Sequence, residues 1–179
     1  SFQHQATGVT VNIDDAIHDM VAQQTATDGA MDQSGLSGFT NVIGSAFADT
    51  IYGDENNNII EGLTGNDQLH GVSGIDTVSY AHATASVWVN ISGDDQSVVT
   101  EADLSANSAY KLGGGNDTLD GFSNIIGSAY DDRLYGSDGA NIIEGGKGSD
   151  TISAGDADSG QTISDTLYGE DAAQSYTDS

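Results

Sequence analysis

The chain has 179 residues, including 24 glycines and neither proline nor cysteine. Its 28 acidic residues face only three basic ones, Lys111, Arg133 and Lys147, so the formal net charge is −25. Disulfide bonds are therefore excluded, and such a polyanion repels nucleic acid and anionic membrane surfaces. No apolar run approaches the roughly 20 residues that span a bilayer. We predict neither a nucleic-acid partner nor membrane insertion.

The first predicted element is a strand at Val9–Ile13, where apolar and polar residues alternate. The next segment, Asp14–Gln24, places its apolar residues on one side of a short predicted helix. The corresponding stretch of the second half of the chain shows no such pattern. We therefore expect the linker over residues 14–35 to be a divergent excursion from the regular part of the fold.

Residues 42–78 form a ladder with a period of nine, which fits neither an amphipathic helix nor a simple hairpin. The ladder's aliphatic residues are Val42, Ile51, Ile60, Leu69 and Val78. Two positions before the last four of these stand Asp49, Asn58, Asp67 and Asp76. Two positions after the first four stand Gly44, Gly53, Gly62 and Gly71.

The second half of the chain repeats the first. Val87–Ile91 resembles the opening strand, and a linker at 92–112, also expected to leave the regular fold, precedes a short stretch with the same signature around Asp117 and Leu119. A second ladder follows, with Ile125, Leu134, Ile143, Ile152, Asp132, Asn141, Asp150, Gly127, Gly136 and Gly145. We predict one repeat unit over 1–78 with its ladder at 42–78, a second over 79–163 with its ladder at 115–155, and a further repeat or a tail over 164–179.

A nine-residue period is typical of a chain that makes a short strand, turns, and makes a strand running back. Two such steps complete one coil of 18 residues with two parallel sheets, and the single aliphatic residue of each strand points inward. The predicted fold is therefore all-β, a right-handed parallel β-roll or β-solenoid. Coils about 4.8 Å apart would stack Asp49 with Asp67 on one edge and Asn58 with Asp76 on the other.

Carboxylates stacked at that spacing repel one another unless a cation lies between them. Aspartate oxygens and backbone carbonyls exposed by glycine form an all-oxygen ligand set, which suits Ca²⁺. We predict several bound calcium ions. The predicted metal-site residues are Gly44, Asp49, Gly53, Asn58, Gly62, Gly65, Asp67, Gly71, Gly74, Asp76, Gly113, Gly115, Asp117, Gly127, Asp132, Gly136, Asn141, Gly145, Gly148 and Asp150.

The strings "GLTGNDQLH", "GVSGIDTVS" and "GGKGSDTIS" resemble the G-G-x-G-x-D-x-U-x nonapeptide of RTX, or haemolysin-type, calcium-binding repeats. The resemblance implies a β-roll that leaves the bacterial cell through a type I secretion system and folds outside, where calcium is abundant. Asn58 and Asn141 replace the expected aspartate, and "GDENNN" and "GSDGAN" lack the full glycine pattern, so we expect weak or empty sites there.

Two other interpretations of the composition stay open: a disordered acidic chain, and an acidic solenoid without metal. The four histidines lack the spacing of a zinc site. Tyr52 and Tyr135 are expected to pack on the outside of a sheet, and Phe39 and Phe122 to cap the solenoid ends.

No catalytic motif is present, and we expect no enzymatic activity. The first functional hypothesis is an extracellular structural module of a large secreted adhesin, of a surface or matrix protein, or of a fibre subunit. The alternative is the C-terminal calcium domain of a type I-secreted protease, lipase, lyase or epimerase. Head-to-tail self-association and cell-surface or matrix partners are further predictions.

Overall fold

The computed structural model describes residues 1–14, 25–27, 32–34, 38–93, 105–155, 166–169 and 175–177. Every regular element within these residues is a β-strand. They contain no helix, and so none long and apolar enough to cross a membrane. The helix expected at Asp14–Gln24 falls almost entirely outside the described residues.

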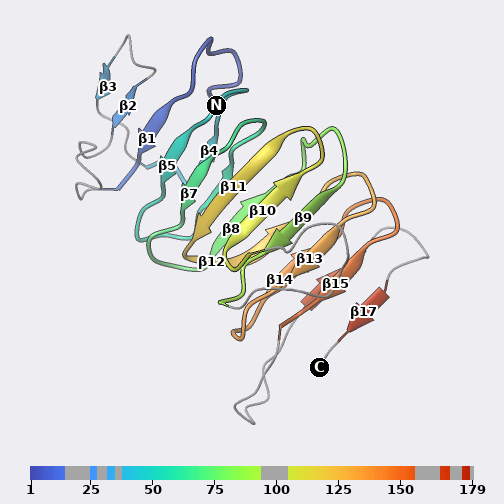
Figure 1. Ribbon diagram of the computed structural model, residues 1–179. Helices are drawn as coiled ribbons and strands as arrows, with labels where there is room; N and C mark the ends of the chain where they lie inside the picture. Colours follow the sequence, from blue (N-terminus) through green and yellow to red (C-terminus); the bar gives the residue numbers. More distant parts are fainter. Residues whose placement is uncertain are drawn as a thin grey trace.

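The described strands form two sheets. The first is an 11-stranded sheet, in the order β17 (Ser175–Thr177), β15 (Thr151–Ser153), β13 (Arg133–Tyr135), β9 (Val87–Asn90), β10 (Ser108–Lys111), β11 (Gly115–Asp120), β7 (Gln68–His70), β5 (Thr50–Tyr52), β1 (Thr10–Asn12), β2 (Thr25–Thr27) and β3 (Asp32–Ser34). The second is a 6-stranded sheet, in the order β16 (Thr166–Tyr168), β14 (Ile142–Glu144), β12 (Phe122–Ile126), β8 (Asp76–Ser79), β6 (Ile59–Glu61) and β4 (Asn41–Ile43). Figure 1 shows the strands stacked along the long axis of the molecule, from β1 near the N-terminus to β17 near the C-terminus.

Successive strands of each ladder alternate between the two sheets, and strands 18 residues apart pair in parallel. Ile51 lies opposite Leu69 in one sheet, and Val42 lies opposite Ile60 in the other. The second ladder repeats this register, with Leu134 opposite Ile152. The predicted 18-residue coil and the parallel β-roll are therefore confirmed.

A single file of aliphatic side chains between the sheets makes the core. Ile60 is 0% exposed, whereas its neighbour Ile59 points the other way and is 39% exposed. Burying one such side chain contributes about 1.5 to 3 kcal/mol. The ladder residues that are fully buried are Ile51, Ile60, Leu69, Val78, Ile125, Leu134, Ile143 and Ile152.

The two ladders stack into one continuous body. β11 pairs with β7, which places Leu119 opposite Leu69, and β12 pairs with β8, which places Ile125 opposite Val78. The second ladder therefore grows directly from the end of the first, and the core continues from one ladder to the other.

The linkers contribute strands to the sheet, so the expectation that they leave the regular fold is wrong for their described parts. β10, from the linker at 92–112, lies between β9 and β11 and is antiparallel to both. β2 and β3, from the linker at 14–35, continue antiparallel from β1 in the same way. An antiparallel strand needs only a short turn, here through Gly113 and Gly115 with positive φ, and it satisfies the hydrogen-bonding groups of both neighbouring strands. The stretch around Asp117 is thus the returning strand of a hairpin.

Aromatic residues occupy the outer face of the 11-stranded sheet. Tyr52 stacks on His70 of the neighbouring strand, with ring centroids 4.6 Å apart. The Arg133 guanidinium lies 4.5 Å from the centroid of the Trp88 ring, which also contacts Tyr110. Tyr52 therefore packs against the sheet, as predicted.

The prediction that Phe122 caps an end of the solenoid is wrong. Phe122 is 7% exposed and lies in the interior strand β12, where its backbone pairs with Asp76 of β8. It is buried because the two ladders stack there. Phe39, its counterpart in the first unit, lies beside the terminal strand β4 and is 51% exposed.

Candidate metal-binding turns

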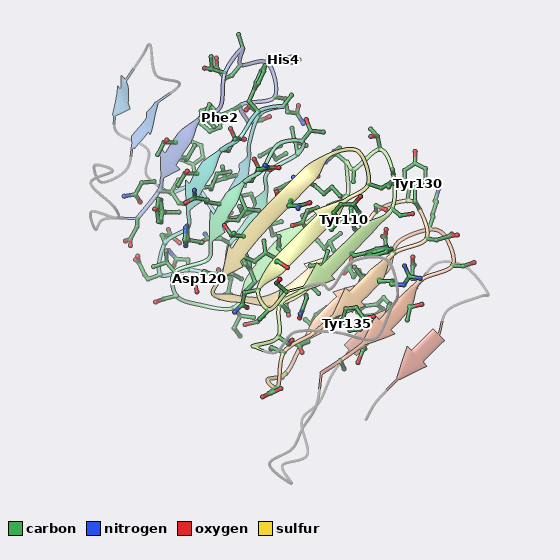
Figure 2. The ribbon with its side chains drawn as sticks, in the orientation of Figure 1. Phe2, His4, Tyr110, Asp120, Tyr130 and Tyr135 are labelled. Carbon is green, nitrogen blue, oxygen red and sulfur yellow. The ribbon has the colours of Figure 1, made fainter. Side chains whose placement is uncertain are left out.

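The turns between the sheets place a row of acidic and amide side chains along each edge of the roll. Tyr130, in the turn before β13, and Asp120, at the end of β11, mark the two opposite edges in Figure 2. The last residue of each ladder turn is aspartate or asparagine. Asp117, in β11, occupies an equivalent position. These side chains are all at most 2% exposed: Asp49, Asn58, Asp67, Asp76, Asp117, Asp132, Asn141 and Asp150.

A backbone hydrogen bond fixes each stacked pair. The Asp49 amide donates to Oδ1 of Asp67 at 3.0 Å, and the Asp67 amide donates to Oδ1 of Asp117 at 3.0 Å. On the opposite edge, the Asn58 amide donates to Oδ1 of Asp76 at 2.8 Å. In each of these pairs, one carboxylate oxygen therefore accepts the backbone amide of the residue stacked on it. The other oxygen faces the turn to which the carboxylate belongs.

The glycine that begins each turn leaves room for that second oxygen. A side chain at Gly44 would collide with Oδ2 of Asp49 and with the carbonyl oxygen of Gly62 in the next coil. Gly127 lies in the same way against Asp132 and the carbonyl of Gly145. The space that a Cβ atom would fill is thus lined by carboxylate and carbonyl oxygens.

The turns at 44–49 and 127–132 are closed by serine. The Ser45 amide donates to Oδ2 of Asp49 at 2.6 Å, and the Ser45 hydroxyl donates to Oδ1 at 2.7 Å. Ser128 makes the same two bonds to Asp132, and the Val87 amide adds a third at 2.8 Å. These carboxylates are therefore satisfied by protein donors.

The turns at 53–58 and 136–141 are closed by asparagine. Oδ1 of Asn58 accepts the Asp54 amide at 2.8 Å, and its Nδ2 donates to the Thr40 carbonyl of the preceding coil at 3.2 Å. Asn141 donates likewise to the Ser123 carbonyl at 2.6 Å. In these turns the asparagine amide therefore donates to a backbone carbonyl that could otherwise bind a cation.

The turns at 62–67, 71–76 and 145–150 have a different backbone, and we call them the open turns. Their second residue has a left-handed conformation, with φ of 70° at Leu63, 79° at Val72 and 86° at Gly146. Their fourth residue is a glycine with positive φ at Gly65, Gly74 and Gly148. A β-branched residue such as Val72 rarely adopts this conformation, which costs about 1 to 3 kcal/mol. Strain of this kind is typical of a backbone held to present its carbonyls to a ligand.

Asp76 gives the clearest sign that an open turn can bind a cation. Its Oδ2 is buried in the open turn and has no hydrogen-bond partner. Burial is the main cause that raises the pKa of Asp76 to about 6. An unpaired buried carboxylate is costly, and a cation at this oxygen would offset that cost. The residues present therefore fit a hard cation such as Ca²⁺.

Backbone carbonyls would have to complete any such site. Within the described part of the chain, no three His, Cys, Asp or Glu side chains converge as a metal-binding group. Each carboxylate row instead runs beside the carbonyls of the glycine-rich turns, an arrangement that Ca²⁺ accepts because it takes six to eight oxygen ligands.

Two of the histidines each lie beside one acidic side chain. His82 pairs with Glu61 at 2.7 Å, and His70 lies 3.4 Å from Asp120.

Sequence reasoning located the turns and singled out the two asparagine turns, but it did not identify the serine donors that close the turns at 44–49 and 127–132. The open turns contain the predicted residues Gly62, Gly65, Gly71, Gly74, Gly145 and Gly148 with their three aspartates, while Gly113 and Gly115 lie in the β10–β11 hairpin. The role of the predicted residues as calcium ligands stays a prediction. Three donors were missed: Ser45, which bonds to Asp49; Ser128, which bonds to Asp132; and Lys111, which bonds to Asp67. The two serines recur at the same place in both units.

The described geometry agrees with a comparison of the sequence with known protein families. The model of the RTX calcium-binding nonapeptide repeat, which describes four copies, matches residues 35–78 and 124–158. These two ranges contain the ladder turns described above. No curated protein matches the chain significantly.

We predict opposite effects of Asp76→Asn with and without calcium. Extrapolated to zero calcium, the free energy of unfolding of the variant should be about 1 to 3 kcal/mol higher than that of the wild type, since the substitution removes an unpaired buried charge. It should also need several-fold more calcium to fold, because the metal loses a charged ligand. Denaturant unfolding at a series of calcium concentrations measures both effects.

Asp132→Asn is the contrasting variant. Its carboxylate accepts protein donors at both oxygens, so the substitution should destabilise the fold with or without calcium by about 1 to 3 kcal/mol. Equal behaviour of the two variants would show that open and closed turns do not differ in their need for a cation.

The pH dependence of stability should change sign with calcium. Burial is the main cause that raises the pKa of Asp76 to about 6 in the folded chain. Protonation of Asp76 then favours the folded state, so the metal-free protein should gain stability as pH falls through about 6 toward 4, by up to about 3 kcal/mol. With calcium bound, protons compete with the metal and the same acidification should destabilise.

Far-ultraviolet circular dichroism of the calcium-free protein should show a larger folded fraction at pH 5 than at pH 7.5, and thermal melts of the calcium-saturated protein should show a lower midpoint at pH 5 than at pH 7.5. The same direction of change in both sets would contradict this prediction.

Proposed function

We propose that the chain is an extracellular structural module of a large secreted adhesin, surface or matrix protein, or fibre-forming protein, because both ladders contain matches to the RTX calcium-binding nonapeptide repeat. RTX repeats bind calcium, so the match supports a calcium-binding repeat module. Secretion through a type I system and folding on calcium outside the cell form part of the proposal.

Charge supports calcium-dependent folding. The chain carries a net charge of −25, and two of its three basic residues already contact other side chains, Lys111 with aspartates and Arg133 with Trp88. Folding without metal therefore brings carboxylates together with few counter-charges. Metal that binds only the folded state supplies stability by mass action, so a calcium-poor compartment favours the unfolded chain.

A role in a repetitive array is supported by the way the units stack. The edge of β12 is covered by β8 of the preceding unit, and the Tyr80 amide donates to the Ile126 carbonyl at 2.8 Å. β4 is the counterpart of β12 in the first unit, and the Phe2 amide donates to the Ile43 carbonyl in the same way at 2.8 Å. In the described sheet, however, β4 is the terminal strand.

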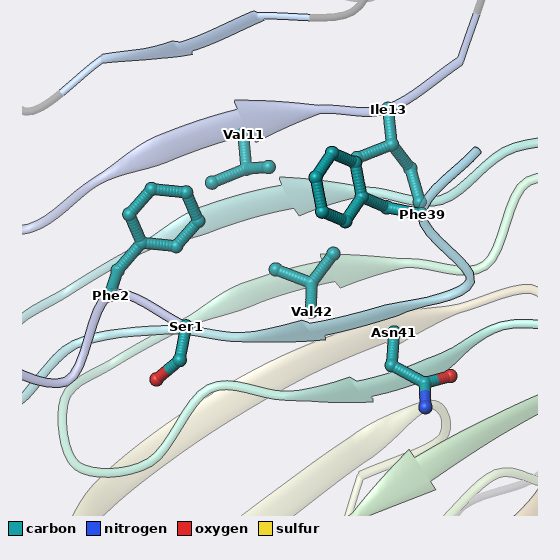
Figure 3. Close-up of a pocket in the computed structure, with 7 residues that line it drawn as sticks. All are labelled: Ser1, Phe2, Val11, Ile13, Phe39, Asn41 and Val42. Atoms are coloured by element: carbon teal, nitrogen blue, oxygen red, sulfur yellow. The ribbon is translucent and has the colours of Figure 1, made fainter. Parts of the chain in front are cut away.

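The end of the core beside β4 is apolar and hollowed. Figure 3 shows Phe2 and Phe39 beside Val11 and Val42, around a cavity of 190 Å³. A strand equivalent to β8 would pair with β4 and cover this cavity, as β8 does for β12. Among the described residues this end is uncovered and matches the junction between the two units, and this observation best supports a module of a longer array.

We propose no catalytic role for the module. The carboxyl groups whose pKa values are raised to about 6 are Asp76, Asp117 and Asp132, and all three belong to the stacked rows. Perturbed carboxylates that recur with the structural period support a structural function over acid–base chemistry.

The array can be tested by extending the chain. A second copy of residues 38–78 placed before Ser1 should pair with β4, melt in one cooperative transition with the original module, and lengthen it by about 14 Å in calcium, since each added strand contributes about 4.8 Å. Calorimetry and small-angle X-ray scattering measure the two effects. The control carries Val78→Asp in the copied segment, which should abolish both.

An extension that melts independently and adds no ordered length would overturn the array. The single calcium domain of a secreted enzyme would then be the better interpretation.

A further inference from the structure

Lys111 is a buried basic residue placed at an acidic edge. It ends β10, which runs antiparallel to β9 and β11, so its position coincides with the edge where the parallel strands begin. The residue is 3% exposed. In a chain with three basic residues and 28 acidic ones, the burial of one of those three calls for a specific function.

The Lys111 ammonium is fully engaged by oxygen atoms. Its Nζ donates to Oδ2 of Asp67 at 2.9 Å, to Oδ1 of Asp117 at 2.7 Å and to the Leu63 carbonyl at 2.8 Å. These three acceptors match the three protons of an ammonium group. The Tyr80 hydroxyl donates to the other oxygen of Asp117 at 3.0 Å.

These oxygens belong to two stacked turns, one from each repeat unit. Leu63 is the second residue and Asp67 the last residue of the turn at 62–67, and Asp117 lies in β11, which stacks on β7. Leu63 holds the same left-handed position in its turn as Val72 does in the turn at 71–76. Oδ2 of Asp67 therefore corresponds to the Asp76 oxygen that has no partner.

We propose that Lys111 is a tethered cation that fills the metal position between the turn at 62–67 and Asp117. The ammonium bridges two carboxylates and the carbonyl of Leu63, whose backbone has a left-handed conformation. A divalent ion between stacked open turns would make the same kind of contacts. The junction at which the second unit stacks on the first then binds no calcium of its own. This inference rests on the proposed calcium-binding function.

Lys111→Met tests the inference, because methionine keeps the length of the side chain and removes the charge. In calcium, the variant should bind one more calcium ion per chain than the wild type, measured by native mass spectrometry and isothermal titration. Arg133→Met is the matched control, since Arg133 lies in strand β13 against Trp88, outside the open turns, and its loss changes the net charge equally. The control should keep the wild-type number of ions.

The same number of ions in folded Lys111→Met and in the wild type would overturn the inference. A wild type that binds no calcium at all would instead refute the proposed function, so the two failures are distinguishable. If Lys111→Met is unfolded in saturating calcium while Lys111→Met/Asp67→Asn/Asp117→Asn folds, calcium cannot replace the ammonium and the inference is also overturned.

Crystals of the wild-type protein grown in calcium give a test that needs no variant. An anomalous difference map should show no ion between Asp67 and Asp117, with the Lys111 ammonium in that place. An ion at that point, with Lys111 turned toward solvent, would contradict the inference.

Discussion

Buried carboxylates stacked at the spacing of the coils are the constraint on which the rest of the structure depends. The inward aliphatic file requires coils of 18 residues, and that register places Asp49 over Asp67 and Asn58 over Asp76. Each backbone amide can satisfy only one oxygen of the carboxylate it meets. The remaining oxygen lies in a turn too crowded for a side chain, so the turn must supply a donor or bind a cation.

The chain meets this requirement in three ways. Serine hydroxyl and amide groups close the turns at Asp49 and Asp132, and an asparagine replaces the acid at residues 58 and 141. Lys111 supplies an internal cation between the two units. The open turns have a strained backbone, and Asp76 in one of them has an oxygen without a hydrogen-bond partner. Metal is therefore required at the open turns rather than evenly along each edge.

The sequence predicted the regular part of the roll because one inward residue and one acid recur in every strand and turn. The pairs 51 with 69 and 134 with 152 follow from that spacing alone. The strand at Ser108–Lys111 could not be predicted in this way, since it is inserted antiparallel and shares neither the period nor the turn signature. Its pairing with β11 is a local hairpin through a glycine turn, whereas its pairing with β9 closes across the linker and depends on three-dimensional stacking.

The site was predicted to a similar degree. Spacing identified the residues at the turns, but the choice between a metal and a protein donor depends on contacts such as that of Ser45 with Asp49. The duplicated strings that contain Ser45 and Ser128 held this signal, because the serine precedes each aspartate by four positions. The contact of Lys111 with Asp67 spans 44 positions and had no local signal.

The most direct test of this account is removal of calcium from the purified protein at pH 7.5, followed by far-ultraviolet circular dichroism and hydrodynamic size. We expect loss of the β signal and expansion of the chain in excess EGTA, both reversed by millimolar calcium but not by magnesium or by sodium chloride of equal ionic strength. A chain that keeps its full β signal and its compact size after exhaustive chelation would contradict the dependence of the stacked carboxylates on a bound cation.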